Sequence, residues 1–210
     1  MNKWKIDWEE QWSIHGRGFR DGYLHVDLHD YVSVKLPNSV LKLKPGPGFG
    51  DLSHPTTRLV LKLMGPYIKG NDVIDLGCGS GILSLAAAAM GAKSVHGIDI
   101  DEEALEHSRL NSRWNGMDKI TQFTTANEYC QHSHPSKSIL LMNMIQSEQQ
   151  NAWQSIASRQ SQITIAVTSG VLVEGRQAYL EMCHRWGWQL REQCQEEGWL
   201  AFAFSTSSSA

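Results

Sequence analysis

Short apolar runs and longer segments of helical period alternate along the chain from residue 70 onward. This alternation is typical of a parallel β-sheet covered by helices. The apolar runs predict strands at residues 72–76, 94–99, 120–125, 138–143 and 162–167. The segments between and after them predict helices at residues 82–90, 102–114, 146–158 and 174–186.

Two further strand-like stretches follow the last predicted helix, at residues 188–193 and 199–204, and the polar turn EEG lies between them at 196–198. We expect them to form an antiparallel hairpin that closes the sheet. The full prediction is an α/β fold with a seven-stranded, mostly parallel sheet whose last strand is antiparallel. The final residues, STSSSA, are polar and are expected to be frayed.

The first 45 residues follow a different pattern. Trp4, Trp8 and Trp12 recur at every fourth position and would form one aromatic stripe on a short helix. Such a stripe either anchors a partner or packs onto the domain, and we favour packing because aromatic stripes at helical spacing usually bury themselves. Partial alternation at residues 23–28 and 31–36 suggests a small hairpin. PGPGFG at residues 45–50 is too rich in glycine and proline for regular structure.

These patterns divide the chain into an amino-terminal helix and hairpin extension (1–45), one α/β domain (46–205) and a disordered tail (206–210). A chain of 210 residues, 41% of them hydrophobic, suits one compact domain with a small appendage. The formal net charge of −3 is too close to balance for an electrostatic nucleic-acid binder. We therefore expect no direct nucleic-acid partner.

The sequence also bears on location and metal content. No apolar run approaches the roughly 20 residues that span a bilayer, and MNKWKIDWEEQW lacks the apolar segment of a secretion signal. We expect a soluble, cytoplasmic protein with no membrane partner. Four cysteines without paired spacing predict reduced thiols. CQHSH at 130–134 lacks a second ligand pair at zinc-ligand spacing, so we expect a polar loop and no metal.

The segment VIDLGCGSGILSLA, residues 73–86, joins an apolar strand to a helix through glycines at 77, 79 and 81. Glycine lets the backbone turn tightly and approach a ligand, and such a turn at the end of a central strand is where open α/β sheets bind nucleotides. A dinucleotide fingerprint, G-x-G-x-x-G, would need glycine at position 82, where this chain has Ile82. The turn therefore favours a nucleoside without a phosphate bridge and argues against an α/β oxidoreductase.

A second motif, GIDID at residues 97–101, ends the next predicted strand. A carboxylate there can accept hydrogen bonds from both hydroxyls of a ribose, and Asp99 is the candidate. We assign Asp101, two residues on, to capping the following helix.

Together these motifs resemble motif I and the following acidic loop of class I S-adenosylmethionine-dependent methyltransferases, which have a Rossmann-like fold. Residues 45–64, PGPGFGDLSHPTTRLVLKLM, are similar to the pattern P-G-x-A-F-G-T-G-x-H-x-T-T that precedes motif I in ribosomal protein L11 methyltransferases. Asn143 falls where that family has N-I-L. Further similar segments, covering about residues 4–204 in the family's order, are WEEQW at 8–12, TSGVL at 168–172 and EEGWLAFAF at 196–204.

The resemblance implies S-adenosyl-L-methionine as the cofactor. Phe49, Gly50 and the segment 54–57 would lie over its methionine end, and the backbone N–H of Cys78, a small filler in the glycine turn, would face the ligand. The cofactor-binding residues that we expect are Phe49, Gly50, Thr57, Gly77, Cys78, Gly79, Asp99, Ile100 and Asn143.

The resemblance also implies an N-methyltransferase acting on a protein lysine or α-amine, with ribosomal protein L11 as the first expected partner. Asn143 would be the catalytic residue, because its neutral amide oxygen can accept a hydrogen bond from an amine and point the lone pair at the methyl. Met144, Ile145 and Phe49 would supply a dry wall. Methylation of another protein or a small-molecule amine, and a catalytically silent scaffold, are the alternatives.

Two departures from the family's pattern stand out. Asp51 and Leu52 replace a threonine and a glycine in the loop, which is expected to affect cofactor affinity or loop closure. In addition, no segment of these 210 residues matches the further amino-terminal domain with which the family grips the ribosomal protein.

Overall fold

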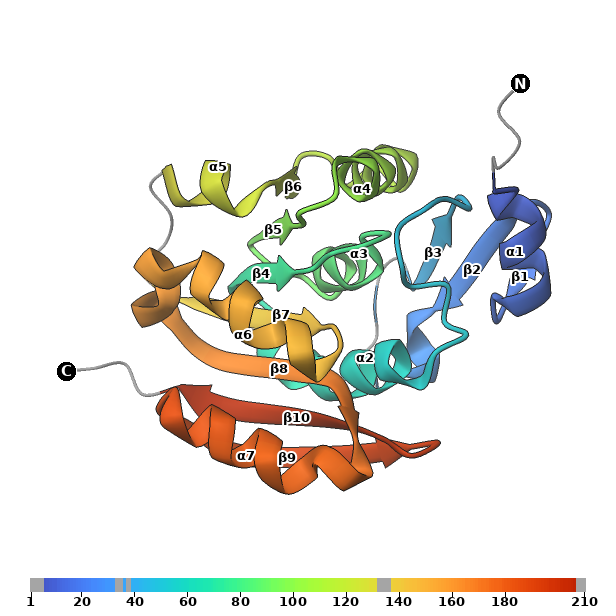
Figure 1. Ribbon diagram of the computed structural model, residues 1–210. Helices are drawn as coiled ribbons and strands as arrows, with labels where there is room; N and C mark the ends of the chain where they lie inside the picture. Colours follow the sequence, from blue (N-terminus) through green and yellow to red (C-terminus); the bar gives the residue numbers. More distant parts are fainter. Residues whose placement is uncertain (1–5, 33–35, 37–38, 132–136, 207–210) are drawn as a thin grey trace.

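The computed structural model describes residues 6–32, 36, 39–131 and 137–206, and it places a seven-stranded sheet beside a three-stranded one (Figure 1). The strands of the larger sheet are β4 (Asp72–Leu76), β5 (Ser94–Ile98), β6 (Thr121–Thr124), β7 (Ser138–Asn143), β8 (Ile163–Leu172), β9 (Trp188–Glu196) and β10 (Trp199–Thr206). The α-helices are α1 (Trp8–His15), α2 (Pro55–Ile68), α3 (Ile82–Ala89), α4 (Glu102–Trp114), α5 (Ala126–Gln131), α6 (Gln146–Ser155) and α7 (Arg176–Arg185). Short 3-10 turns lie at Leu28–Asp30, Ala157–Gln162 and Val173–Gly175.

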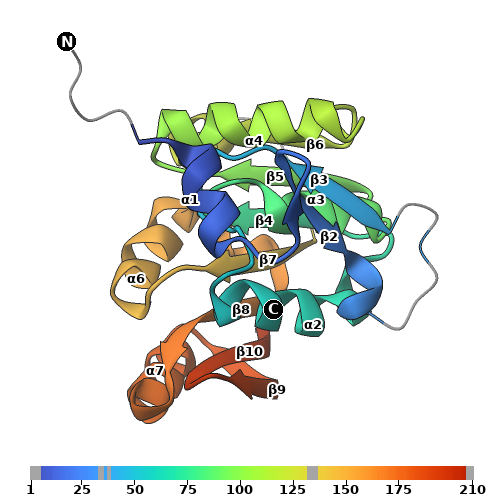
Figure 2. The same ribbon diagram turned by 90° about the vertical axis from the view of Figure 1, so that its right-hand side faces the viewer.

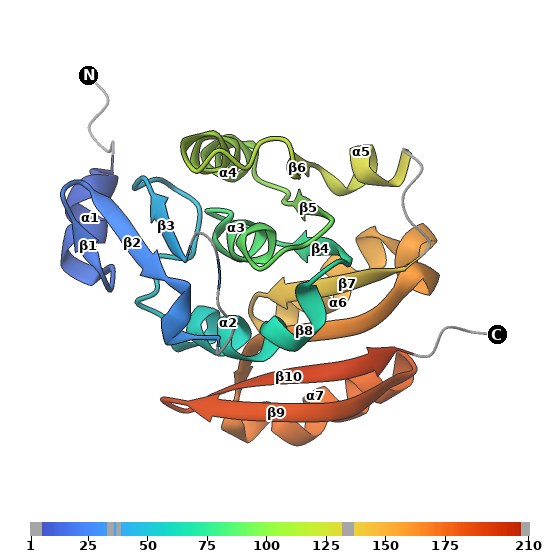
Figure 3. The same ribbon diagram turned by 180° about the vertical axis from the view of Figure 1, so that it is seen from behind.

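The larger sheet has the strand order β6-β5-β4-β7-β8-β10-β9. The pairs from β6 to β8 are parallel, and β10 is antiparallel to both β8 and β9. The predicted closing hairpin is therefore confirmed, with β10 inserted between β8 and the edge strand β9 (Figure 3). β4 is buried along its whole length because helices cover both faces of the sheet.

Apolar side chains form a separate core on each face of the larger sheet. On one face α2 and α3 pack against alternate residues of the central strands, and on the other α5, α6 and α7 do so. The opposite-facing neighbours Val73 and Ile74 in β4 belong to the two different cores, as the period-two geometry of a strand requires. The α/β prediction from apolar runs is confirmed.

Most predicted elements have the expected bounds, within one to three residues. The main differences are β8, which continues five residues beyond the predicted strand, and the helices α2 and α5, which the apolar pattern did not predict. β8 extends because its far half pairs with β10, from Thr168 opposite Phe202 to Leu172 opposite Trp199.

The predicted amino-terminal hairpin is wrong in its second strand. β2 (Tyr23–Asp27) is present, but its partners are β1 (Phe19–Arg20) and β3 (Val40–Leu43). Tyr31 follows the 3-10 turn instead of starting a strand, and residues 33–35 lie outside the described part. β3 pairs with β2 in place of the predicted second strand, because Leu41 and Leu43 alternate with exposed neighbours and are fully buried against the core.

The tryptophan stripe packs onto the domain where the structure describes it. Trp12 is 4% exposed and its ring meets the His107 ring of α4 edge-on, with 5.8 Å between centroids. Trp8 is half-buried, and Trp4 lies outside the described residues. Figure 2 looks at the side on which the parallel strands end, and α1 lies in front of the sheet there. The amino-terminal residues thus join the same core as α2 and α3.

Among the described residues, no helix combines the length and apolar character needed to cross a membrane. The four cysteines are free thiols. Residues 132–136, which include most of the CQHSH segment, lie outside the described part.

Candidate functional site

The glycine turn lies at the carboxyl end of β4, as the sequence predicts. Gly77, Gly79 and Gly81 have φ values of 79°, 54° and 81°, which other residues adopt only at an energetic cost. The N–H groups of Gly77 and Cys78 both donate to the carbonyl of Ile98, at 2.7 and 3.0 Å. The turn is thereby fixed to the end of β5.

The expectation for Cys78 needs a correction. Its N–H donates to β5 and does not face outward, because the turn folds back onto the neighbouring strand. The thiol is buried 3.6 Å from the Ser108 hydroxyl, and burial raises its pKa, so it is a packing residue and not a reactive one.

Asp99 points its carboxylate at the glycine turn. Its Oδ2 accepts the N–H of Gly79 at 2.9 Å, and its Oδ1 accepts the N–H groups of Ile100 and Asp101 at 2.8 and 3.1 Å. Ile100 is 96% exposed, so an apolar side chain stands uncovered beside this carboxylate. Asp101 caps α4 through the N–H of Glu103, as expected.

Asn143 and Thr57 meet on the other side of the turn. The Asn143 Nδ2 donates to the Thr57 hydroxyl at 3.1 Å, which joins the end of β7 to the first turn of α2. Thr57 is fully buried and Asn143 half-buried. With Nδ2 engaged, the amide oxygen is the end of the Asn143 side chain that points away from Thr57.

Met144 fills the space between the glycine turn and β8. A Cβ added to Gly77 would lie 2.4 Å from the Met144 methyl carbon, and one added to Gly170 would lie 1.9 Å from the Met144 carbonyl oxygen. The backbone contact requires glycine at position 170, whereas at position 77 it is the φ of 79° that favours glycine, since the Met144 methyl can shift. The segment TSGVL contributes to the site in this way, by letting β8 approach the segment that carries Asn143.

A buried polar network that sequence reasoning missed supports the same segment. The Gln149 Nε2 donates to the carbonyls of Met144 and Ser169, each at 2.9 Å. The Tyr179 hydroxyl hydrogen-bonds Gln149 Oε1 at 2.6 Å and Thr168 Oγ1 at 2.7 Å. These residues join α6, α7 and β8, so the backbone after Asn143 is held from three elements.

The loop at residues 45–54 lies directly on the glycine turn. The Ser80 N–H donates to the Phe49 carbonyl at 2.9 Å. A Cβ added to Gly48 would lie 2.4 Å from the carbonyl carbon of Gly79, so the two backbones touch. Phe49 itself is 53% exposed, which leaves its ring at the rim of the site.

Leu52 occupies the place where the L11 methyltransferase pattern has glycine, and it keeps a left-handed backbone with φ of 63°. Its side chain is 2% exposed and joins the core with α2 and α3. Asp51, at the threonine position, accepts hydrogen bonds from the N–H and hydroxyl of Ser53 at 3.0 and 2.6 Å. The backbone at residue 52 thus keeps the left-handed conformation that glycine favours, and the Leu52 side chain anchors the loop in the core.

His54 caps α2. Its Nδ1 accepts the N–H of Thr56, and its ring lies edge-on to Phe49 and Trp199, at centroid distances of 5.9 and 4.7 Å. Burial lowers the pKa of His54. The neutral ring required for capping is therefore the favoured form.

Arg58, which sequence reasoning also missed, fastens the loop to the closing hairpin. Its Nη1 donates to the carbonyls of Leu52 and Ser53 at 2.7 and 2.9 Å. Its Nε donates to Glu196 at 2.7 Å and its Nη2 to Glu197 at 2.9 Å. Arg58 is 3% exposed, so a buried guanidinium is satisfied by backbone carbonyls of the loop and by two carboxylates of the hairpin, of which Glu197 is exposed.

Asp75 is a buried carboxyl two residues before the glycine turn. The Ser84 hydroxyl donates to its Oδ2 at 2.7 Å, whereas its Oδ1 has no hydrogen-bond partner among the described residues. Burial raises the pKa of Asp75 to about 7. The Oδ1 atom of Asp75 is thus a buried acceptor without a described partner beside the glycine turn. A polar ligand bound at this turn would supply the missing donor.

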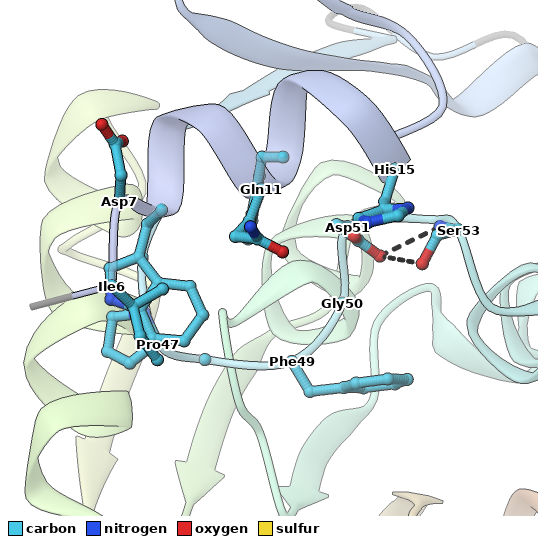
Figure 4. A pocket seen from close by; sticks show the side chains of 13 residues that line it. Ile6, Asp7, Gln11, His15, Pro47, Phe49, Gly50, Asp51 and Ser53 are labelled. Atoms are coloured by element: carbon cyan, nitrogen blue, oxygen red, sulfur yellow. Dashed lines mark hydrogen bonds between the residues drawn. The ribbon is translucent and has the colours of Figure 1, made fainter. Parts of the chain in front are cut away.

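A cavity of about 620 Å³ lies on the outer side of the loop, between α1 and residues 46–53 (Figure 4). Figure 4 shows Gln11 pointing from α1 toward the loop and Asp51 bonded to Ser53 beside His15. Phe49, Gly50 and Asp51 line the cavity. Gly77, Asp99 and Asn143 are not among the lining residues, so the loop separates this cavity from the strand ends.

Comparisons with known proteins show which family and fold this chain resembles. Ribosomal protein L11 methyltransferases from Chromobacterium violaceum and Methylococcus capsulatus are 36% and 32% identical over 165 and 198 residues, which is 78% and 93% of this chain. A crystal structure of ribosomal protein L11 methylase from Lactobacillus delbrueckii subsp. bulgaricus superposes with a TM-score of 0.67 at 22% identity, covering 87% of this chain and 98% of that one. This likeness shows the fold.

The chain spans 53% of the Chromobacterium protein and 67% of the Methylococcus one. The family model described as ribosomal protein L11 methyltransferase (PrmA) matches residues 2–207, nearly the whole chain. The chain therefore belongs to the ribosomal protein L11 methyltransferase family.

Proposed function

We propose that this chain is an S-adenosyl-L-methionine-dependent N-methyltransferase. The observation that carries the proposal is the hydrogen bond from the Gly79 N–H to the Asp99 carboxylate, which joins a bare glycine turn to an acidic strand end at the carboxyl edge of the sheet. Open α/β sheets bind nucleosides at such edges. Membership of a methyltransferase family supports the same activity.

The cofactor would lie between the glycine turn, Asp99 and the loop that carries Phe49 and Gly50. Asp99 would accept hydrogen bonds from the ribose hydroxyls, and Ile100, uncovered beside it, would lie against the adenine. The orphaned Oδ1 of Asp75 would receive a donor from the methionine end. When bound, S-adenosyl-L-methionine supplies an electrophilic methyl on a sulfonium.

Asn143 would align the acceptor amine. Its Nδ2 is held by Thr57, so its Oδ1 can accept an amine N–H and direct the nitrogen lone pair toward the methyl. As the new N–C bond forms, the S–C bond breaks, and the methylated amine afterwards releases a proton to water. Met144, Ile145 and Phe49 would supply apolar surface around this point, which would favour the uncharged amine over ammonium.

The acceptor that we propose first is a lysine or α-amine of a protein, since the relatives carry the name ribosomal protein L11 methyltransferase. Another protein or a small-molecule amine is the alternative. In this proposal residues 46–205 form the catalytic unit, residues 1–45 form an amino-terminal extension, and the enzyme acts in the cytoplasm.

The test has two stages. Calorimetry with S-adenosyl-L-methionine is expected to detect binding by the purified chain, and absence of binding would leave only a catalytically silent scaffold. Transfer of radiolabelled methyl into fractionated ribosomal proteins, other cell proteins and small molecules then identifies the acceptor. Label in an L11-sized band supports the first proposal, and label confined to other fractions replaces it with the alternative.

A further inference from the structure

The imidazole ring of His107 lies in the bend of the loop at residues 44–48, next to the glycine turn. His107 belongs to α4, is 5% exposed, and its ring is so close to Gly46 that a Cβ there would lie 2.6 Å from it. Its Nε2 lies 2.7 Å from the Lys44 carbonyl oxygen, and its Nδ1 accepts the N–H of Gly48 at 3.2 Å. One imidazole therefore bridges residues 44 and 48 across the bend of the loop.

The two backbone partners fix the protonation of this ring. A carbonyl can only accept, so Nε2 must carry a hydrogen, and an N–H can only donate, so Nδ1 must be bare. The ring is consequently the neutral Nε2–H tautomer. Burial lowers the pKa of His107, which favours this form. Around the ring are the Trp12 indole and the loop backbone, while the Lys44 ammonium lies over the Trp114 ring, 4.9 Å from its centroid.

The same face of α4 holds the glycine turn. The Ser108 hydroxyl donates to the Gly79 carbonyl at 2.7 Å. Asn111 donates to the Ser80 carbonyl at 3.0 Å and accepts the Lys44 N–H at 2.9 Å. Three residues on one face of this helix thus fix the loop and the turn relative to each other, although residues 44–48 and 79–80 belong to different segments.

We propose that His107 is a positioning residue that keeps the loop at residues 44–48 closed over the glycine turn and so preforms the cofactor site. The proposal rests on the proposed function. A loop already held in place loses less entropy when ligand binds, so the clamp raises cofactor affinity. It also makes that affinity sensitive to acid, because a protonated Nδ1 would present a donor to the Gly48 N–H and the hydrogen bond would be lost.

The test compares wild type with His107→Leu and His107→Gln by calorimetric titration with S-adenosyl-L-homocysteine between pH 5 and pH 8. His107→Leu removes both hydrogen bonds at similar volume and is expected to weaken binding about tenfold at pH 7.5. His107→Gln retains a donor and an acceptor without titrating. It is expected to restore most of the affinity and to lose the decline that wild type shows as pH falls through the lowered pKa of His107. His184→Gln, an exposed substitution on α7, is the matched control and keeps the wild-type profile.

Hydrogen exchange of the Gly48 amide in the free protein gives a readout that needs no cofactor. Strong protection in wild type that His107→Leu abolishes and His107→Gln retains supports the clamp. Equal protection in all three proteins, or an acid decline in binding that His107→Gln retains, overturns it. If wild type binds no S-adenosyl-L-homocysteine at any pH, the proposed function fails, and the exchange experiment still decides whether the clamp exists. If His107→Leu does not fold, wild type and His107→Gln still give the pH comparison.

Discussion

The amide of Asn143 and the hydroxyl of Thr57 form a 3.1 Å hydrogen bond across 86 residues of sequence. This bond places the end of β7 against the first turn of α2, directly after the loop that covers the glycine turn. It also selects one orientation of the amide. Under the proposed function, the side chain that aligns the amine would therefore be held by the first turn of the helix that follows the loop, and cofactor binding and amine alignment would share one structural element.

Replacing Asn143 with alanine is expected to lower kcat about 100-fold, because the amine would lose its alignment. The affinity for S-adenosyl-L-methionine should change less than about fivefold, the size expected for one neutral hydrogen bond. Steady-state kinetics and calorimetry measure the two effects. Thr57→Val, which frees the amide without removing it, is the matched variant and should reduce kcat less. Equal losses of turnover and affinity in Asn143→Ala would indicate cofactor binding alone.

The Asp99→Ala variant should bind S-adenosyl-L-methionine more weakly by about 1.5 to 3 kcal/mol, since hydrogen bonds to a charged acceptor are worth about that much. Calorimetry checks the value. Asp101→Ala provides the control, because Asp101 caps α4 through the Glu103 N–H. That substitution should reduce the free energy of unfolding by about 1 kcal/mol and leave cofactor affinity unchanged. A ribose role for Asp99 is untenable if its variant binds as tightly as wild type.

Asp75 gives stability a pH dependence of predictable sign. Its pKa is raised from 3.8 to about 7 in the folded protein, so between these values the unfolded chain has released a proton that the folded protein keeps. The contribution of Asp75 to stability is therefore present below about pH 4 and lost as pH rises toward 7. The difference corresponds to as much as about 4 kcal/mol at pH 8.

Asp75→Asn removes this titration. The variant is expected to be more stable than wild type at pH 8 and to show a flatter profile of unfolding free energy between pH 4 and pH 8, measured by urea denaturation. Asp118→Asn, at an exposed position, serves as the control and should follow wild type. A variant profile parallel to that of wild type would contradict the assignment to Asp75.

Leu52 should reverse the usual order of alanine and glycine variants. Both substitutions remove a buried side chain and are expected to cost about 2 to 5 kcal/mol. Glycine also relieves the left-handed backbone at φ of 63°, which is worth about 1 kcal/mol. Leu52→Gly should thus be more stable than Leu52→Ala by urea denaturation. Leu59, buried within α2, is the matched position, where alanine should be the more stable by about 1 kcal/mol.

The sequence predicts the larger sheet well because its strands are defined by local pattern. β4 and β7 match the expected bounds at both ends, since apolar runs bounded by turn residues leave little ambiguity. The prediction of the second strand of the amino-terminal hairpin is wrong because local pattern does not define that strand. Residues 31–36 and Val40–Leu43 both show partial alternation, and only the burial of Leu41 and Leu43 against a distant core decides between them.

The candidate site likewise contains some residues that the sequence predicts and others that it does not. Gly77 and Asp99 follow from motifs that carry their own spacing, and the structure brings both to one edge of the sheet. Arg58 and His107 could not be predicted from one sequence. Their partners are Glu196, 138 residues away from Arg58, and Gly48, 59 residues away from His107. Nothing in the local pattern of α2 or α4 indicates that a particular arginine or histidine faces a loop.

The bonds from Arg58 to Glu196 and Glu197 have a consequence for the order in which the parts of the fold can settle. Both glutamates lie at the turn of the β9–β10 hairpin, which joins the rest of the larger sheet through the pairing of β10 with β8. Until that hairpin has docked, Arg58 lacks the acidic partners of a buried cation. The loop beside the glycine turn should accordingly reach its final shape only as a late step of folding, once the hairpin is in place.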